Sequence, residues 1–430
     1  MTNSETKNFS QNVSSSYHLE DKCKCNKNTC ANARNVPKLR FKGYNDEWKH
    51  VKIGEIYKER SERGNTDAEL LSVTMNDGVK RRIDIEGKDI SSEDKSNYKS
   101  VYIGDMVYNS MRMWQGANGI SNYDGIVSPA YTVMFPKTKL CNNFIGYLFK
   151  YEPLIFLFRR YSQGLTSDTW NLKYPQIKQL SISIPSLLEQ EKIASFLTLI
   201  DKKIEKQKEL VELLKKYKRG LLSAIFSQKL RFKDDNGNNY PAWEEKSLGE
   251  VTGNISYGLN AASKDYDGEN KYIRITDIDE TTGKYNNLDI VSPDCVLSDD
   301  YKLKINDLLF ARTGASTGKT YLYNENDGKI YFAGFLIKFS IKNEYCSNFI
   351  FYITQTFNYK KWVSIMSARS GQPGINAKEY SNYKFSCPVY DEQVKIANII
   401  SKLDNIIEKE NILLDSYNDY KKGLLQKMFI

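Results

Sequence analysis

The sequence predicts an α+β protein in which two mixed α/β domains are separated by two long helices that form an antiparallel coiled coil, with a pseudo-twofold internal duplication. Three observations predict this fold. One long segment recurs later in the chain, both copies have the apolar spacing of paired helices, and the stretches before them contain short β-forming runs. The 430 residues, 40% hydrophobic and 27% charged, suffice for two to three domains with sizeable cores.

Residues 1–36 are expected to form a disordered tail, because they are rich in Ser, Asn and Lys and poor in apolar side chains. His18, Cys23, Cys25 and Cys30 lie within it, but their spacing matches no common zinc finger, so we expect no metal site. The seven cysteines are odd in number and lack a disulfide framework, which favours a reducing cytoplasm. No apolar run approaches the ~20 residues of a membrane span.

The duplication is clearest in the two long segments. Residues 190–226 align without gaps with residues 393–429, and 15 of 37 positions are identical. A shorter echo, Leu-Arg-Phe-Lys at 39–42 and again at 230–233, opens the region before each segment. These repeats divide the chain into a tail at 1–36, a first domain at 37–187, a central helix at 188–228, a second domain at 229–389 and a C-terminal helix at 390–430.

Both long segments predict helices that pair with each other. Apolar residues alternate steps of four and three, which favours a coiled-coil seam over a surface helix. The expected pairing residues are Ile193, Leu197, Ile200, Ile204, Val211, Leu214, Ile396, Ile400, Leu403, Ile407, Leu414 and Tyr417. Polar residues interrupt both seams at equivalent places, Gln207 and Lys218 in one and Glu410 and Lys421 in the other, and such breaks oppose slippage. Antiparallel pairing is favoured because each helix follows its own copy of the domain.

The start of each long helix is marked in the same way. Pro185 and Pro388 stand just before the helices and fix the direction in which the chain enters them. Glu189 and Asp391 then place a negative charge near the positive end of each helix dipole.

The domains themselves are expected to mix α and β structure. Residues 131–135 and 336–340 are rich in β-forming side chains and predict strands. Gly-Asp-Met-Val-Tyr at 104–108 resembles Asn-Asp-Leu-Leu-Phe at 306–310, so the repeat extends weakly into the domains.

Two segments resemble catalytic motifs, but neither is a convincing match to the motif that it resembles. Residues 314–320, Gly-Ala-Ser-Thr-Gly-Lys-Thr, resemble a phosphate-binding loop, but one residue is missing between the glycines and a strand is expected to follow instead of a helix. Asp84, Glu86 and Lys88 resemble a metal-nuclease cluster, yet a solvated charged loop explains them as well. We therefore expect a non-catalytic chain with no cofactor or metal of its own.

Several loops combine Arg, Gln and Asn with aromatic residues. Arg can make bidentate contacts with guanine and Gln or Asn with adenine, although a single Arg more often contacts phosphate. The net charge of +9 permits a polyanionic partner. The expected DNA-contacting residues are Lys80, Arg81, Arg82, Arg112, Gln115, Gln163 and Trp170 in the first domain, and Arg274, Arg312, Thr313, Lys319, Arg369, Gln372 and Asn376 in the second.

Duplicated variable domains, each followed by a helix that begins near Glu-Gln-x-Lys-Ile-Ala, resemble the specificity subunit of bacterial type I restriction–modification systems. The phrases at 391–397, 421–425 and 104–108 are also similar to those of that family. The resemblance covers residues 37–430 and implies two target recognition domains, each reading half of a bipartite site in double-stranded DNA. Because the two domains diverge outside their framework, we expect an asymmetric site.

The resemblance also implies partners and a location. The helices would set the distance between the half-sites and dock two modification subunits, and restriction subunits would complete the complex. S-adenosylmethionine, ATP and Mg would belong to those partner chains in the bacterial cytoplasm. Two alternatives remain: a coiled-coil adaptor without sequence-specific DNA binding, and a nuclease that uses Asp84. Selective retention of a duplex with one split sequence would argue against the adaptor.

Overall fold

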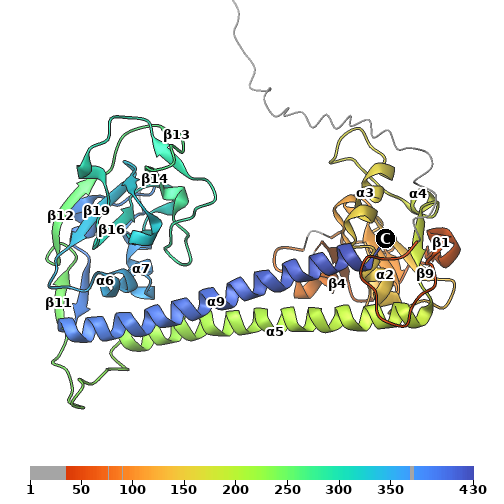
Figure 1. Cartoon of the computed structure of the whole chain (residues 1–430), viewed down its shortest axis with the longest axis horizontal. Coiled ribbons are helices and arrows are strands. Elements are labelled where there is room, and N and C mark those ends of the chain that lie inside the picture. Colours follow the sequence, from red (N-terminus) through yellow and green to blue (C-terminus); the bar gives the residue numbers. More distant parts are fainter. Residues whose placement is uncertain (1–34, 76, 90, 369–371) are drawn as a thin grey trace, which may run out of the picture. The chain divides into compact units, whose positions relative to one another are not determined.

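The computed structural model describes residues 35–75, 77–89, 91–368 and 372–430. The chain divides into two compact units, residues 1–201 with 419–430, and residues 202–418. Both units contain part of the long helices α5 (Leu187–Phe226) and α9 (Tyr390–Met428), which are labelled in Figure 1. We call the residues before α5 the first domain and the residues between α5 and α9 the second domain.

The first domain alternates short strands with short helices. Its elements are β1 (Lys49–Lys52), α1 (Ile53–Ile56), β2 (Tyr57–Glu59), β3 (Leu71–Thr74), β4 (Gly78–Arg81), η1 (Arg82–Asp84), β5 (Lys99–Val101), β6 (Met106–Asn109), η2 (Met113–Gln115), β7 (Asn118–Ile120), β8 (Gly125–Val127), β9 (Tyr131–Pro136), α2 (Asn142–Leu148), α3 (Glu152–Tyr161), α4 (Tyr174–Ile177) and β10 (Ser181–Ile184). Four strands form an antiparallel sheet in the order β2-β9-β6-β7, and β1-β10, β3-β4 and β5-β8 form smaller antiparallel pairs.

The core of the first unit joins the domain to the ends of both long helices. Phe144 of α2 packs edge-to-face against Trp48 and also against Phe429, just beyond the end of α9. Ile193 and Leu197 of α5 are buried in the same cluster. Burial of large apolar side chains from three segments stabilises their association by about 1.5–3 kcal/mol for each side chain.

The second domain repeats this plan with additional strands. Its elements are β11 (Glu244–Ser247), β12 (Thr252–Tyr257), β13 (Ser263–Asp265), β14 (Lys271–Ile273), η3 (Ile275–Asp277), β15 (Val291–Pro293), η4 (Asp299–Tyr301), β16 (Asp307–Ala311), η5 (Gly314–Ser316), β17 (Thr320–Leu322), η6 (Glu325–Asp327), β18 (Ile330–Phe332), β19 (Leu336–Ile341), α6 (Ser347–Ile353), α7 (Phe357–Met366), α8 (Ala377–Ser381) and β20 (Lys384–Cys387). The main sheet has the order β12-β19-β16-β17, β11 pairs with β20 and β13 with β15, and β14 pairs with β18 in parallel.

The main sheets of the two domains therefore have the same strand order. The predicted strands at 131–135 and 336–340 are confirmed as β9 and β19, each beside the strand that carries the Gly-Asp or Asn-Asp motif. In the second unit, Phe349 of α6 packs against Trp243 and against Phe226 at the end of α5. Phe226 and Phe429 are equivalent in the repeat, so each occupies the corresponding place in its own unit.

The phrase Glu-Gln-x-Lys-Ile-Ala fastens each helix to its domain. Gln190 accepts a bond from the Cys141 backbone N–H at 3.1 Å and donates to the Pro185 carbonyl at 3.0 Å. Gln393 makes the same two bonds in the second unit, at 2.9 Å from Cys346 and 2.8 Å to the carbonyl of Pro388. Both helices begin two residues after these prolines, as their position predicted.

A buried glutamate precedes each of these glutamines and holds an arginine of the domain. Glu189 accepts from Arg40 at 2.7 Å, and Glu392 accepts from Arg231 at 2.8 Å. Asp391, which was expected to lie near the positive end of α9, is exposed in the first turn of that helix, and Glu392 beside it is the buried counterpart of Glu189. Both acidic residues lie in the first turn, so the predicted negative charge at the start of α9 is confirmed.

The polar interruptions of the long helices contact one another. In the second unit, Gln207 of α5 donates to the Glu410 carboxylate of α9 at 2.6 Å. Further along α5, Lys218 lies 2.6 Å from Asp404, which precedes Glu410 in α9, so the helices run antiparallel there. In the first unit, Lys421 lies 2.6 Å from Asp201.

In each of the two lysine–aspartate ion pairs, the aspartate also accepts a hydrogen bond from a tyrosine of the adjoining domain. Tyr147 donates to Asp201 at 2.7 Å, and the ammonium of Lys421 lies 5.6 Å from the centre of its ring. In the second unit, the hydroxyl of Tyr352 donates to Asp404 at 3.0 Å, with Lys218 at 5.5 Å from that ring. Charge-assisted bonds of this kind fix the rotation of a helix more firmly than apolar contacts do.

All twelve predicted pairing residues are buried or half-buried. Those with the least exposure are Ile193, Leu197, Val211, Ile396, Ile400, Leu403 and Ile407. Ile396 and Ile400 belong to the core of the second domain, as Ile193 and Leu197 belong to that of the first, so these four also anchor the domains.

Candidate nucleic-acid interface

The two loops of the first domain that were predicted to contact DNA lie side by side. Loop 110–117 follows β6, and loop 162–171 follows α3. The backbone N–H of Leu172 donates to the Ser110 carbonyl at 2.8 Å and so joins the second loop to the first. The structure therefore brings together two segments that are far apart in the sequence.

The second domain joins the corresponding loops in the same way. Loop 312–319 follows β16, and loop 372–376 precedes α8. The N–H of Ile375 donates to the carbonyl of Arg312 at 2.9 Å, and the N–H of Gly314 donates to the Pro373 carbonyl at 2.9 Å. Arg369 lies outside the described residues, as do His18, Cys23, Cys25 and Cys30.

The centre of the first-domain surface is a pair of tryptophans with an arginine above them. Trp114 and Trp170 pack edge-to-face with their ring centres 5.2 Å apart. The guanidinium of Arg159, from α3, lies 5.3 Å from the centre of Trp170 and 6.0 Å from that of Trp114. Trp170 is half-buried and supports this cluster. Sequence reasoning missed Arg159, because no local motif links a residue of α3 to the two loops.

Loop 162–171 is closed by its own hydrogen bonds. Gln163 and Asn171 exchange two backbone bonds of 2.9 and 2.8 Å, and the N–H of Thr169 donates to the Thr166 carbonyl. Gly164 has a φ of +149°, and a Cβ there would lie 2.6 Å from the Thr169 carbonyl, so only glycine fits. The loop therefore presents exposed Gln163 on a fixed backbone.

Arg112 and Gln115 of the first domain are both exposed on the adjoining turn η2. The amide of Gln115 is thus available to a ligand, as is the guanidinium of Arg112. Both residues remain candidates for DNA contact.

Arg312 is the counterpart of this arrangement in the second domain. Its guanidinium lies 5.1 Å from the centre of the Tyr257 ring, and its buried Nε has no hydrogen-bond partner within the described residues. Thr313 precedes the turn η5, and Gln372 is exposed beside it. Asn376 accepts the N–H of residue 379 and caps α8, which commits its side-chain oxygen to the fold.

Three predicted basic residues of the first domain lie near the end of β4. Arg81 forms an ion pair of 2.8 Å with Asp84, and Arg82 donates to backbone carbonyls of residues 85, 87 and 88. Lys80 is half-buried in the strand. In this structure Arg82 therefore shapes a loop, and Arg81 would have to leave Asp84 to contact a phosphate.

Two predicted basic residues of the second domain are paired with carboxylates. Arg274 contacts Asp277 at 2.9 Å and Asp289 at 3.0 Å, and the hydrogen bonds to Asp277 raise the pKa of its guanidinium further. Lys319 lies 3.5 Å from Glu280. These pairings reduce the positive charge that either residue presents.

A half-buried lysine supports the first-domain loop. Lys150 donates to the carbonyl of Gly116 at 2.6 Å and to that of Met75 at 2.8 Å, so it ties loop 110–117 to the β3–β4 turn. Burial, with a smaller contribution from the charge of Lys421, lowers the pKa of the Lys150 ammonium to about 8. The sequence gives no sign of this role.

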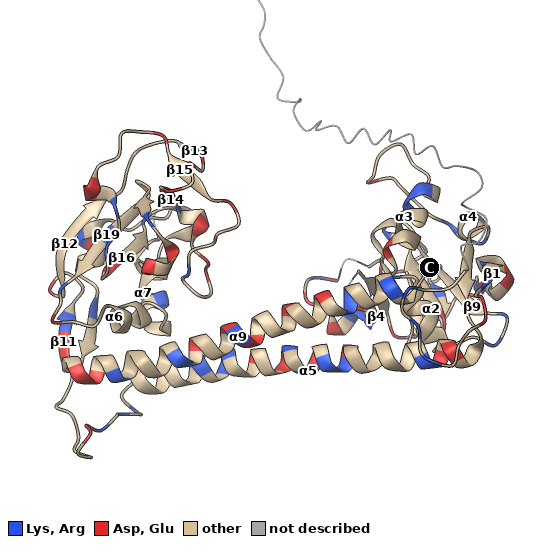
Figure 2. Cartoon of the chain, in the orientation of Figure 1, with Lys and Arg blue, Asp and Glu red and all other residues tan. Residues whose placement is uncertain are grey.

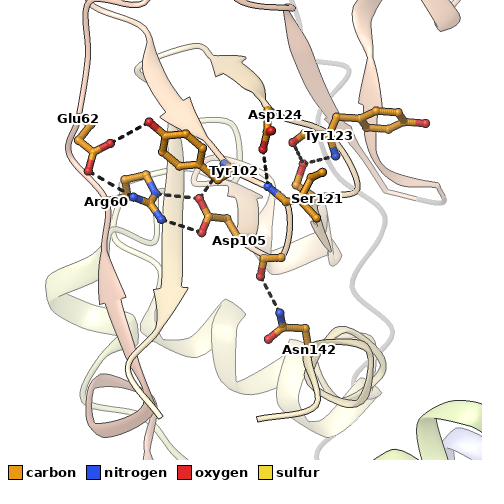
Figure 3. A network of polar contacts seen from close by, with 10 residues as sticks. Arg60, Glu62, Tyr102, Asp105, Ser121, Tyr123, Asp124 and Asn142 are labelled. Atoms are coloured by element: carbon orange, nitrogen blue, oxygen red, sulfur yellow. Dashed lines mark hydrogen bonds and ion pairs between the residues drawn. The ribbon is translucent and has the colours of Figure 1, made fainter. Parts of the chain in front are cut away.

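The Gly-Asp motif at 104–105 builds the framework of the domain. Asp105 is buried, accepts two bonds from Arg60 at 2.8 and 3.1 Å, and accepts the N–H of Tyr102 at 2.9 Å (Figure 3). Gly104 has a φ of +91°, and Asn306, its counterpart, has a φ of +70°. Both residue types tolerate this left-handed backbone, which explains their interchange in the repeat.

The two motifs that resembled catalytic sites are a glycine-rich turn before β17 and a charged segment after β4. The strand β17 begins at Thr320, so a strand follows the glycine-rich run, as predicted. Asp84 is held by Arg81, and among the described residues no three His, Cys, Asp or Glu side chains are grouped so as to hold a metal ion.

The charge of the long helices is mixed. Figure 2 shows basic and acidic residues interspersed along both α5 and α9. Every helix in the described part of the chain is too short or too polar to span a bilayer.

Comparison with known proteins identifies the class of fold. A family model described as the type I restriction modification DNA specificity domain matches residues 45–215 and again residues 228–415. The type I restriction enzyme StySPI specificity subunit of Salmonella potsdam is 24% identical over 316 residues, which cover 70% of this chain and 65% of that subunit, slightly under two thirds of its length.

Two solved structures have a similar fold. The crystal structure of a type I restriction-modification system S subunit from M. genitalium has a TM-score of 0.54 at 16% identity, over 92% of this chain and 99% of that one. A chain from a study of complex assembly and conformational transition of the type I R-M system has a TM-score of 0.57 at 15% identity, over 90% of this chain and 98% of that one. With two copies of the family model covering most of its length, the chain belongs to the type I restriction modification DNA specificity domain family.

Proposed function

We propose that this chain is the sequence-specific DNA-binding subunit of a type I restriction–modification complex and has no catalytic activity of its own. The observation that carries the proposal is that, in both domains, a loop after an equivalent strand, β6 or β16, is hydrogen-bonded to a second loop, and Arg and Gln side chains lie on these loops next to an aromatic residue. Such side chains are the ones that read base edges. Membership of the family supports DNA as the ligand.

Each domain reads one half of a bipartite site. The two surfaces differ in composition, so the two halves differ in sequence and the site is asymmetric. The proposed readers are Arg112, Gln163 and Trp170 for one half-site, and Arg312, Arg369 and Gln372 for the other. Lys and Arg contacts to phosphate supply non-specific affinity that decreases steeply with salt.

The long helices form an antiparallel coiled coil with a pseudo-twofold axis near Gln207 and Glu410. These two residues are equivalents in the repeat, and they contact each other. The 203-residue repeat also converts the Asp201–Lys421 pair into Asp404–Lys218, which supports the same symmetry.

The helix pair also docks the partner chains. Leu210, Leu213 and Tyr217 of α5 are exposed in the second unit, as are Ile412 and Leu413 of α9. Exposed apolar side chains on paired helices are typical of a surface that another protein covers. Two modification subunits occupy this surface, and they and the restriction subunits carry S-adenosylmethionine, ATP and Mg in the cytoplasm.

The first test separates recognition from catalysis. The purified chain alone should not methylate DNA, whereas addition of a modification subunit should give methylation at one split sequence. Methyl transfer by the chain alone would contradict the non-catalytic role. A complex that methylates without any preferred sequence would favour the adaptor alternative.

The second test concerns the distance between half-sites. Insertion of four residues into both helices, beside Gln207 and Glu410, adds ~6 Å of helix, or about two base pairs. Insertion of seven preserves the heptad and adds ~10.5 Å, or about three base pairs. Both variants should keep the half-site sequences in the methylome but lengthen the spacer, and an unchanged spacer would show that the helices do not set it.

A further inference from the structure

Arg159 and the two indole rings beside it come from three separate segments of the first domain. The guanidinium comes from α3, Trp114 from the loop after β6, and Trp170 from the closed loop after α3. The indole N–H of Trp114 donates to the carbonyl of Met111 at 3.1 Å, which fixes the orientation of that ring. Within the described residues Arg159 forms no ion pair, in contrast to Arg81 and its carboxylate partner.

We infer that Arg159 is a specificity-determining residue whose guanidinium, held against the Trp114–Trp170 pair, reads the edge of a guanine. The inference rests on the proposed function and names a residue within it. An arginine placed over aromatic rings keeps its N–H donors in the plane of the guanidinium, where they can form two parallel bonds with O6 and N7 of guanine. The rings also reduce the side-chain entropy that binding would otherwise remove.

The position of Arg159 favours a base over a phosphate. The residue lies in the last turn of α3, where the aligned backbone carbonyls give the helix end a partial negative charge. That charge disfavours a phosphate, with its full negative charge, more than the acceptor edge of guanine, which carries only partial charges. The exposed guanidinium of Arg159 also lies beside two indole rings, which suit a base better than a solvated anion.

The second domain provides a parallel for this arrangement. There Arg312 lies over Tyr257 at 5.1 Å, beside the two joined loops. The aromatic support and the arginine come from different elements in the two domains, β12 and the end of β16 in one, and two loops and α3 in the other. Each domain thus holds one arginine on an aromatic ring next to its joined loops.

The test uses the full chain assembled with its modification subunit. Complexes that carry Arg159→Ala, Arg159→Lys or Arg160→Ala are used to enrich a library of randomised duplexes, and the bound sequences are compared with those of the unaltered complex. Arg160 is the matched control, because it is the exposed neighbour on the same helix turn and does not lie over the indoles.

We expect Arg159→Ala to lose preference for guanine at one position of one half-site by about tenfold or more, with the other half-site unchanged. Arg159→Lys should lose the same preference, since an ammonium cannot form the two parallel bonds. Arg160→Ala should retain it. The half-site affected by Arg312→Ala should be the other one.

Two outcomes would overturn the inference. One is equal weakening of all sequences by Arg159→Ala with recovery in Arg159→Lys, which identifies a phosphate contact. The other is an unchanged preference in a folded Arg159→Lys complex, which retains its charge even if the alanine variant fails to assemble. If the unaltered complex enriches no sequence, the proposed function itself fails, and this result is distinct from both.

Discussion

The two domains share a framework but differ at their loops. Both use a buried glutamate of the long helix to hold an arginine, and both place an aspartate after a left-handed residue at the start of a central strand. In contrast, the arginine proposed to contact a base lies beside different aromatic residues in the two domains. Arg159 lies beside a tryptophan pair, and Arg312 lies over Tyr257. The comparison teaches that the residues repeated in both domains build the framework. The residues suited to recognition lie in loops whose sequences differ between the two domains.

The largest expected effect tests the shared part of the comparison. Glu392 is fully buried and accepts bonds from Arg231 and from the indole of Trp243. Glu392→Ala should lower the free energy of unfolding by about 3 kcal/mol, because it leaves an arginine without its buried partner. Urea unfolding measures the change, and Asp391→Ala, at the exposed neighbour, should alter the free energy by less than about 0.5 kcal/mol.

The equivalent substitution in the first unit should cost somewhat less. Glu189 holds Arg40 but receives no indole bond, since the Nε1 of buried Trp48 has no hydrogen-bond partner within the described residues. Equal losses for Glu189→Ala and Glu392→Ala would show that the additional bond to Trp243 does not contribute.

The next prediction tests the part of the comparison that differs. Arg312→Ala should cost about 1–3 kcal/mol in binding of the preferred duplex and relax one base position of a single half-site. Tyr257→Leu should have a smaller effect in the same direction, because it removes only the support of the guanidinium. Competition binding with single-base variants of the duplex measures both. Uniform weakening across all duplexes would make Arg312 a phosphate contact.

A pH-dependent difference should distinguish the two units. The pKa of Lys150 is about 8 in the folded protein against an ordinary value of 10.5, so between these values only the unfolded chain keeps the proton. Relative to Lys150→Met, the unaltered protein should therefore gain about 1–2 kcal/mol of stability as the pH rises from about 8 to 10.5. The partial exposure of the side chain limits the size of this gain.

The second unit supplies the control for this pH effect. Its repeat equivalent of Lys150 is Gln355, which accepts a bond from Lys218 and does not titrate. Comparison of Gln355→Met with the unaltered protein should show no such pH-dependent difference. The same slope in both comparisons would assign the effect to another group.

The smallest effect concerns the helix ion pairs. Lys218→Met and Lys421→Met should each lower the free energy of unfolding by about 1 kcal/mol. Each substitution removes one ion pair between the lysine and a partly exposed carboxylate. The first should cost slightly more, since Lys218 also donates to Gln355 at 2.8 Å. Thermal unfolding midpoints measure the difference, and a markedly larger loss at Lys421 would contradict the equivalence of the two sites.

Features that are local or periodic along the chain could be predicted from the sequence. The matched polar residues Gln207 and Glu410 were visible as interruptions of an apolar pattern, and the structure explains them by direct contact. The strands β9 and β19 followed from the propensity of short runs. The expected negative charges at the starts of the long helices are confirmed, since Glu189 lies in the first turn of α5 and Asp391 in that of α9. The buried contact of Glu392 with Arg231 was not predicted, because it joins segments that are far apart in the sequence.

The sequence by itself determined the duplication, the two long helices and the loops that contain Arg, Gln and aromatic residues, because these depend on spacing and composition along the chain. The tertiary structure alone decided which side chains of those loops meet. Arg159, Trp114 and Trp170 become neighbours only when α3 and two loops fold together, and Lys150 acquires its low pKa only through burial. Contacts between distant segments depend on packing in three dimensions, and no local pattern in the chain records them.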